Sequence, residues 1–310
     1  MNTSRFPELT DCTICPRKCH TNRSVDVTGF CGSGTGFHIG SICVHKGEEP
    51  VLSGTRGMCN VFFTRCNMRC IYCQNAQISR NRGPIMGRAM PLTEVVEQIE
   101  EILETGISMV GFVSPSHVIP QMRAIIEAIR SDGLNPTFVM NTNAYDKVET
   151  IASLADMIDV YLPDLKYMDS DLAASYSATP DYPQVATAAI AEMYRQKGEQ
   201  TELDSEGLIR SGLIIRHLVL PGQIENSKQC LRFVAKHLSP KIHISVMSQY
   251  HPTEAVRDHP LLGRTLHPEE YEEVLDEMDH LGLENGWIQE MESDSEYVPD
   301  FSSPNPFESA

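Results

Sequence analysis

The feature that most constrains the fold of this chain is a regular alternation of apolar and amphipathic segments that begins near residue 57. Short apolar runs predict strands at residues 60–64, 108–113, 137–140, 157–162, 213–220 and 242–247. Amphipathic stretches predict helices at residues 93–105, 120–131, 147–155, 182–197, 226–238 and 268–281. Repeated strand–helix units favour a mostly parallel sheet with crossover helices. Six units are too few for a closed eight-unit barrel, so we expect an α/β fold with an open, partial barrel.

The composition changes along the chain, which predicts three regions. Residues 1–55 are rich in Cys, Gly, Ser and Thr and show little periodicity, so we expect a cysteine-rich N-terminal lobe. The partial barrel is expected over residues 56–291, with one more strand at 287–291. Residues 292–310 are acidic and rich in Ser and Pro, which predicts a disordered tail. In such a barrel, functional groups collect on the loops that follow the carboxyl ends of the strands.

The charge balance and the termini limit the class of protein. The chain has 310 residues, 25 of them basic and 42 acidic, for a net charge of −17. This charge argues against nonspecific binding to nucleic acids or anionic membranes. No run of 18 apolar residues occurs, so no membrane span is expected. The N-terminus has no apolar signal region, so we expect a cytoplasmic protein whose thiols stay reduced.

Nine of the ten cysteines precede residue 74, and three of them form the pattern C-x3-C-x2-C at Cys66, Cys70 and Cys73. In a reducing compartment, crowded thiols indicate ligands of a metal or cluster. Three thiolates leave one iron of a four-iron cluster without a protein ligand, and a catalytic metal needs such an open position. The alternative is one buried face of a helix, since the spacing is i, i+4, i+7. The polar residues between the cysteines, and the strand expected just before them, favour a loop.

The motif, with Tyr72 directly before its third cysteine, resembles that of the radical S-adenosylmethionine (radical SAM) enzymes. The similarity is closest to pyruvate formate-lyase activating enzyme-like proteins with a cysteine-rich N-terminus, and it covers nearly the whole chain. It implies a partial (β/α)6 barrel, a [4Fe–4S] cluster held by Cys66, Cys70 and Cys73, and SAM bound at the fourth iron. It also implies that one electron, from a flavodoxin- or ferredoxin-type donor, cleaves SAM to methionine and a 5′-deoxyadenosyl radical that abstracts hydrogen.

The resemblance further implies a set of residues around SAM. They are Tyr72 within the motif, Arg216 within a predicted strand, and, after predicted strands, Ser114, Ser116, Asn143, Asp164, Lys166 and His251. Tyr72 would stack on the adenine, and Arg216 would reach the SAM carboxylate. Ser114 and Ser116 stand where the family often has Gly-Gly-Glu. Simpler roles remain open for these residues: core packing for Tyr72, a structural ion pair for Arg216, an ordinary strand–helix loop for the two serines.

Asp164 and Lys166 belong to an Asp-Leu-Lys element that is similar to one in the activating enzymes, and a surface ion pair is the alternative. His251 ends the sixth strand segment, where a capping role is equally open. The activating enzymes use two aspartates to hold a monovalent cation beside SAM. Asn141 replaces one of them here, so the sequence does not establish this cation site.

A second group of cysteines lies in the N-terminal lobe, spaced C-x2-C-x3-C-x11-C, at Cys12, Cys15, Cys19 and Cys31. Four thiolates suffice for a structural zinc site or an auxiliary iron–sulfur cluster. Either would explain how the lobe folds without a hydrophobic core. The alternatives are a reduced redox pair or buried thiols, and Cys43 or Cys59 could replace one of the four.

The sequence thus supports one leading function and two alternatives. The leading function is a radical SAM oxidoreductase that resembles a glycyl-radical activase, with a partner enzyme that carries a glycine on an exposed loop. The first alternative is a radical SAM enzyme acting on a small molecule, a peptide or RNA, and the net negative charge weakens the RNA case. The second is a noncatalytic iron–sulfur or zinc protein. The residues expected around SAM argue against the second, because an electron carrier needs no such pocket.

Overall fold

The computed structural model describes residues 5–25, 29–291, 299–303 and 305–307. Within them, a ten-stranded sheet has the order β10-β9-β8-β6-β5-β4-β2-β1-β3, with β7 paired to β8 beside this path. The strands are β1 (Phe37–His45), β2 (Met58–Phe63), β3 (Arg88–Met90), β4 (Met109–Val113), β5 (Thr137–Thr142), β6 (Val160–Pro163), β7 (Glu202–Leu203), β8 (Ile209–Leu218), β9 (His243–Met247) and β10 (Gly286–Ile288).

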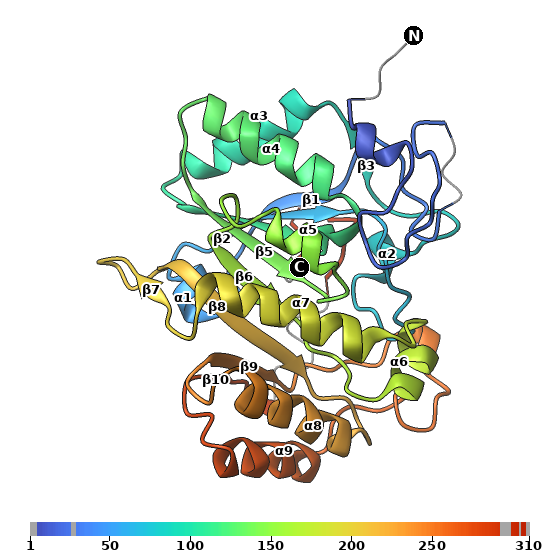
Figure 1. Ribbon diagram of the computed structural model, residues 1–310, viewed down its shortest axis with the longest axis vertical. Helices are drawn as coiled ribbons and strands as arrows, with labels where there is room; N and C mark the ends of the chain where they lie inside the picture. The colour runs from blue at the N-terminus through green and yellow to red at the C-terminus, as the bar shows by residue number, and fades with distance from the viewer. Residues whose placement is uncertain (1–4, 26–28, 292–298, 304, 308–310) are drawn as a thin grey trace.

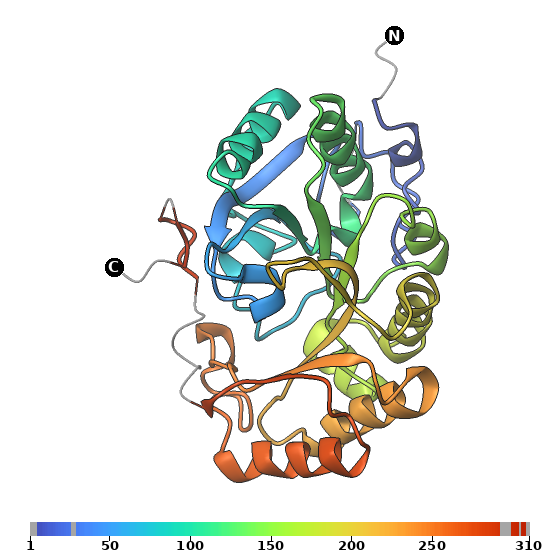
Figure 2. The ribbon, with the colours of Figure 1, turned by 90° about the vertical axis from the view of Figure 1, so that its left-hand side faces the viewer.

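Helices connect these strands, and the longer ones, among them α3, α4, α7, α8 and α9, lie on the outer face of the sheet (Figures 1 and 2). The α-helices are α1 (Pro50–Ser53), α2 (Ala76–Ser79), α3 (Leu92–Leu103), α4 (Ile119–Ser131), α5 (Val148–Ala152), α6 (Ser170–Ser177), α7 (Tyr182–Lys197), α8 (Ile224–Phe233) and α9 (Pro268–His280). The shorter turns are η1 (Pro7–Leu9), η2 (Pro115–His117), the π-helical η3 (Val234–Leu238) and η4 (Glu254–Val256).

The predicted α/β fold with an open, mostly parallel sheet is confirmed. Strands β2, β4, β5, β6, β8, β9 and β10 pair in parallel along the sheet, and β10 and β3 form its two unjoined edges. Every residue of β2, β4 and β6 is buried. Parallel strands covered on both faces are apolar without alternation, which is why these runs stood out in the sequence.

The outer helices follow from their apolar periodicity. Helix α4 buries residues three or four apart along one face, among them Ile119, Met122, Ile126 and Ile129. Gly133, at a positive φ of 85°, lies just after its end, as is common at helix C-termini. The predicted helix at 182–197 coincides with α7. The predicted helix at 226–238 is α8 followed by the π-helical turn η3.

The structure differs from the sequence-based expectation in the N-terminal region. Strand β1 lies within residues 1–55 and pairs antiparallel with β2 and β3, so it belongs to the barrel sheet. Its register shifts between Ile39 and Ser41, which breaks the alternation that would have revealed a strand. The short helix α6 was also not expected. Its first turn is capped by Asp169, whose side chain accepts hydrogen bonds from the amides of Asp171 and Leu172.

The predicted disordered tail falls partly outside the described residues, at 292–298, 304 and 308–310. The described part packs against the barrel: Phe301 is buried, and it contacts the Phe62 ring edge to face at 5.4 Å between centroids. The Phe301 amide donates a hydrogen bond of 2.7 Å to the side chain of Gln77 in α2. Among the described residues, no helix has the length and apolar character needed to cross a membrane.

Candidate active site

The carboxyl ends of the parallel strands surround a pocket. Its wall includes the three cysteines of the C-x3-C-x2-C motif, which lie on the loop after β2. The loops after the next strands contribute Ser114, Asn143, Asp164 and Lys166, and strands β5 and β8 contribute Asn141 and Arg216. These positions meet because the carboxyl ends of parallel strands share one edge of a sheet.

The loop that carries the cysteines is held in place by segments distant in the sequence. The amides of Arg69 and Ile71 donate hydrogen bonds to the carbonyls of Ser177 and Tyr176, at 3.1 and 2.9 Å. These carbonyls lie at the end of α6. The side chain of Asn67 donates to the Tyr145 carbonyl at 2.7 Å. The unexpected helix α6 therefore positions the cysteine loop.

The thiol of Cys66 has two hydrogen-bond donors close to its sulfur. The amide of Met68 lies 3.4 Å from the Cys66 Sγ, and the Nδ2 of Asn143 lies 3.5 Å from it. Asn143 also donates to the Oδ1 of Asn67 at 2.9 Å. Burial raises the pKa of the Cys66 thiol to about 12.

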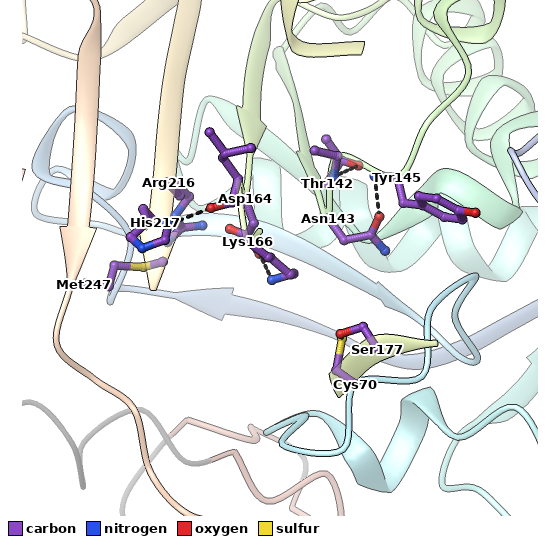
Figure 3. Close-up of polar contacts among 12 residues, drawn as sticks. Cys70, Thr142, Asn143, Tyr145, Asp164, Lys166, Ser177, Arg216, His217 and Met247 are labelled. Carbon is purple, nitrogen blue, oxygen red and sulfur yellow. Dashed lines mark hydrogen bonds and ion pairs between the residues drawn. The ribbon is translucent and has the colours of Figure 1, made fainter. Parts of the chain in front are cut away.

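The other two cysteines of the motif have serine hydroxyls beside them. The Ser177 hydroxyl donates to the Cys70 Sγ at 3.0 Å, as Figure 3 shows, and the Ser79 hydroxyl lies 3.2 Å from the Cys73 Sγ. Burial also raises the pKa of the Cys70 thiol, to about 11. Hydrogen bonds to sulfur stabilise the thiolate form, which is the form that binds metals.

Asp164 and Lys166 form an ion pair at the pocket wall, with 2.7 Å between Oδ2 and Nζ (Figure 3). Burial disfavours the charge on Lys166, but Asp164 and then Cys70 outweigh this and raise the pKa of the ammonium group. The hydroxyl of Tyr182 donates to the Asp164 carbonyl at 2.6 Å and fixes the backbone beneath the pair. The pair presents both signs of charge to the pocket.

Arg216 is the second cation of the site, and its side chain is buried. Its acidic partners were not expected from the sequence. Its Nη2 lies 3.0 Å from Glu48, and its Nε lies 3.1 Å from Glu49. Burial opposes the charge, but Glu49, Glu48 and Asp164 raise the pKa of the guanidinium. The structure therefore shows the ion pair that the sequence left as the alternative for Arg216, although the side chain also lines the pocket.

Glu48 completes a buried polar cluster under the pocket. Burial opposes its ionisation, but Arg216, His45 and the amide of Asn60 together lower the pKa of the carboxyl. The Asn60 Nδ2 donates to Glu48 at 2.8 Å. Nothing in the sequence singled out Glu48, because its partners lie on distant strands.

The structure brings most of the expected SAM-binding residues together and leaves two apart. The residues at the pocket are Tyr72, Ser114, Asn143, Asp164, Lys166 and Arg216. Ser116 and His251 are not part of its wall. Ser116 is buried, and its hydroxyl lies 3.1 Å from that of Thr142, which ends β5. The left-handed backbone at Ser114, with φ of 50°, turns the following residues away from the pocket.

The pocket wall also contains side chains that the sequence analysis did not name. Among them are His45, Glu48, Gln249, Tyr250 and Phe307. Gln249 and Tyr250 follow β9 directly, so the rule that functional groups lie after strand ends could have found them. Phe307 comes from the C-terminal segment, which no sequence pattern connects to the barrel.

The sequence profile of the radical SAM superfamily matches residues 60–233, more than half of the chain. The chain belongs to the radical SAM superfamily. Its matched residues span the cysteine loop, the strands from β4 to β8 and the outer helices between them. The family binds a [4Fe–4S] cluster and SAM.

Known proteins similar to this chain include one curated relative and several solved structures. Uncharacterized protein MJ0674 of Methanocaldococcus jannaschii is 26% identical over 274 residues, which cover 86% of this chain and 73% of the relative. Streptococcus suis SuiB, solved with its precursor peptide SuiA, has a TM-score of 0.50 at 15% identity, covering 73% of this chain. The match covers 47% of SuiB, so this chain spans about half of it. This similarity concerns the fold.

A domain of pyruvate-formate lyase-activating enzyme from Bacteroides vulgatus is also similar, with a TM-score of 0.39 and 16% identity. The match covers 56% of this chain and 93% of that domain.

The side chains at the pocket fit the family's cofactors. Cys66, Cys70 and Cys73 each have a hydrogen-bonding group beside the sulfur, and all three face the same pocket. Among the described residues, no group of three or more His, Cys, Asp or Glu side chains is arranged to hold a single metal ion. A cluster with several irons needs its ligands further apart than one ion does, so this finding is compatible with a cluster.

Proposed function

We propose that this protein is a radical SAM enzyme that holds its cluster with Cys66, Cys70 and Cys73 and abstracts hydrogen from a polypeptide, as a glycyl-radical activase does. The observation that supports the cluster assignment is the meeting of three thiols with polar SAM-side residues at one pocket. When bound, the reduced cluster supplies the electron that cleaves SAM to methionine and a 5′-deoxyadenosyl radical.

The residues of this chain would hold and orient the reactants. Cys66, Cys70 and Cys73 would hold the cluster, and the position that they leave open would take the amino and carboxylate groups of SAM. The ion pair of Asp164 and Lys166 offers a cation for the carboxylate and an anion for the amino group or the ribose. Tyr72 is held by a hydrogen bond of 2.6 Å between its hydroxyl and that of Tyr167, and its ring packs against those of Tyr176 and Tyr250, with 6.4 and 6.1 Å between centroids. A ring held in this way needs no reordering when the adenine stacks on it.

Apolar side chains close the rest of the wall and would keep water from a reactive radical. They include Phe62, Leu218, Met247 and Phe307. Excluding water prevents side reactions and strengthens the electrostatic interactions inside the pocket.

The position of the C-terminal segment favours a polypeptide substrate over a small molecule. Phe307, in a segment of this chain, reaches the pocket wall and packs against His45, with 4.1 Å between ring centroids. A side chain borne on a polypeptide segment thus already lies at the edge of the site, which supports a substrate of the same kind. The net charge of −17 weakens the alternative of an RNA substrate.

Release of 5′-deoxyadenosine tests the radical SAM activity. Anaerobic, cluster-loaded protein is mixed with dithionite and SAM, and the nucleoside is quantified by chromatography. We expect release from the wild type, none from Cys70→Ala, and release from Cys230→Ala, whose buried thiol lies in α8, outside the pocket. A cluster-loaded wild type that releases none would favour a noncatalytic iron–sulfur protein.

The activase role needs a second experiment with a protein substrate. The glycyl-radical enzyme of the same organism is incubated anaerobically with this protein, SAM and a reduced flavodoxin or ferredoxin. A glycine-centred radical in the electron paramagnetic resonance (EPR) spectrum is the expected result. If 5′-deoxyadenosine forms and no radical appears on the partner, the alternative of another substrate is favoured.

A further inference from the structure

The four cysteines of the N-terminal lobe gather around one small cavity. Cys12, Cys15, Cys19 and Cys31 all line it, and three of them are buried. The cavity is separate from the candidate active site, with which it shares no lining residue. Four thiols that line one cavity supply the donor set of a thiolate metal site.

The three cysteines that belong to neither the active-site motif nor this group lie elsewhere in the fold. Cys43 lies on β1 and Cys59 on the adjacent β2, and neither lines the cavity. Cys230 is buried in α8. The structure thus selects four cysteines from the six that the sequence left as candidates for the N-terminal site.

Backbone and side-chain donors point at these sulfurs. The amide of Phe30 lies 3.3 Å from the Cys19 Sγ, and the amide of Ser33 lies 3.5 Å from the Cys31 Sγ. The guanidinium of Arg23, itself buried, lies 3.8 Å from the Cys12 Sγ. Such donors stabilise negative charge on sulfur, and so the thiolate form that a metal requires.

The local backbone is strained in a way that packing alone does not explain. Lys18 and His20, on either side of Cys19, both adopt left-handed conformations, with φ of 42° and 52°. Left-handed conformations are unfavourable for residues other than glycine and persist where the surroundings fix them. In the described residues between Thr10 and Gly36 the backbone forms turns and bends without a helix or strand. A bound metal supplies the missing constraint.

We propose that Cys12, Cys15, Cys19 and Cys31 hold a second metal centre with four thiolate ligands, distinct from the radical SAM cluster. Zinc and an iron–sulfur cluster share this ligand chemistry. Among the described residues, no group of three or more His, Cys, Asp or Glu side chains is arranged to hold a single ion. This applies to these four cysteines and equally to the three cysteines of the active site.

The proposed centre adjoins the loop that carries Cys66, Cys70 and Cys73. Arg17 donates from Nε to the Asn67 carbonyl at 2.9 Å, and its guanidinium lies over the Phe30 ring at 3.5 Å. Arg69, in the cysteine loop, covers the same ring at 4.1 Å. The centre therefore braces the loop next to Cys66.

A second connection reaches the start of this loop. Arg23 donates to the carbonyls of Ser33 and Gly34, each at 2.8 Å, and to that of His117 at 2.7 Å. The Nε2 of His117 lies 3.0 Å from the Thr64 carbonyl, at the end of β2. By these contacts the lobe supports the cysteine loop from two sides.

Metal and sulfide analysis of the anaerobically purified full chain tests the proposal. For the wild type we expect about four irons for one cluster, plus either about one zinc or about four further irons with matching sulfide. Cys12→Ala and Cys15→Ala should lose the additional metal and keep the EPR signal of the SAM-dependent cluster. Cys70→Ala should lose the EPR signal of the SAM-dependent cluster and keep the additional metal. Cys43→Ala, a buried thiol outside both cavities, should keep both centres.

The metal analysis of the wild type is by itself sufficient to refute the proposal. The test therefore does not depend on whether the variants fold. Iron for a single cluster with no zinc would refute the second centre. So would metal content that is the same in the wild type, Cys12→Ala and Cys15→Ala. Either result would leave the proposed radical SAM activity intact, because that activity is tested by 5′-deoxyadenosine release.

Discussion

The hydroxyl of Ser177 donates a hydrogen bond to the sulfur of Cys70 across 3.0 Å, joining the end of α6 to the cysteine loop. The same hydroxyl lies 2.7 Å from that of Tyr167, which lies 2.6 Å from that of Tyr72. The side chains of Ser177, Tyr167 and Tyr72 are buried, whereas Cys70 is partly exposed and lines the pocket. Hydrogen bonds to ligand sulfurs and solvent exposure are among the factors that set the potential of an iron–sulfur cluster.

Ser177→Ala should therefore lower the reduction potential of the cluster. The lost hydrogen bond favours the reduced, more negatively charged state by about 1 kcal/mol, which corresponds to roughly 40 mV for one electron. A redox titration followed by EPR measures the shift. Ser175→Ala, an exposed serine of the same helix, is the control. An unchanged potential in Ser177→Ala would contradict the assignment.

Removing the buried cation between Glu48 and Glu49 should destabilise the fold. Arg216→Met leaves two buried carboxylates without their partner, which costs about 3–5 kcal/mol of unfolding free energy. Anaerobic urea denaturation provides the measurement. Arg56→Met breaks an ion pair with Glu206 in which both side chains are more than half exposed, so its loss should stay below about 1 kcal/mol. Equal losses in the two variants would show that the buried pairs are not stabilising.

The stability of the C-terminal part should depend on pH through Glu270. The carboxylate accepts hydrogen bonds from Arg264 and from the amides of His267 and Gly222, and Arg264 foremost lowers its pKa to about 2. The folded-state pKa is below the unfolded value of about 4.3, so the stabilisation is present above pH 4.3 and is lost as the pH falls towards 2. The stabilisation that Glu270 contributes to folding has an upper limit of about 3 kcal/mol.

Glu270→Gln should consequently be less stable than the wild type at pH 7 and should lose less stability between pH 5 and pH 2.5. Thermal unfolding followed by circular dichroism at each pH measures this. Glu269→Gln, at an exposed neighbouring position, should keep the wild-type pH dependence. If Glu270→Gln follows the wild-type curve, the contacts of this carboxylate are not coupled to folding.

The sequence predicted those parts of the fold and of the candidate site that local patterns of residues determine. Buried parallel strands leave apolar runs, and the cysteine spacing and the Asp164–Lys166 pair lie directly after such runs. The partners of these residues were not visible, because tertiary contacts bring them from far away. Glu48 is 168 positions from Arg216, and Ser177 is 107 positions from Cys70. The role of each residue towards SAM stays a prediction.

The C-terminal segment should limit access to the pocket. Phe307 contacts the tilted ring of His45 and lies 5.5 Å from the Phe62 ring, between centroids, at the pocket wall. An aromatic pair contributes about 0.5–1.5 kcal/mol, so losing this contact should raise the population of a displaced segment about 2- to 10-fold. Phe307→Ala should then bind SAM with a faster association rate, measured by stopped-flow on cluster-loaded protein. Ser302→Ala, an exposed residue of the same segment, is the matched control. The same association rate in Phe307→Ala and the wild type would mean that the segment does not restrict entry of SAM. A change of this rate in Ser302→Ala would indicate a general loosening of the segment instead.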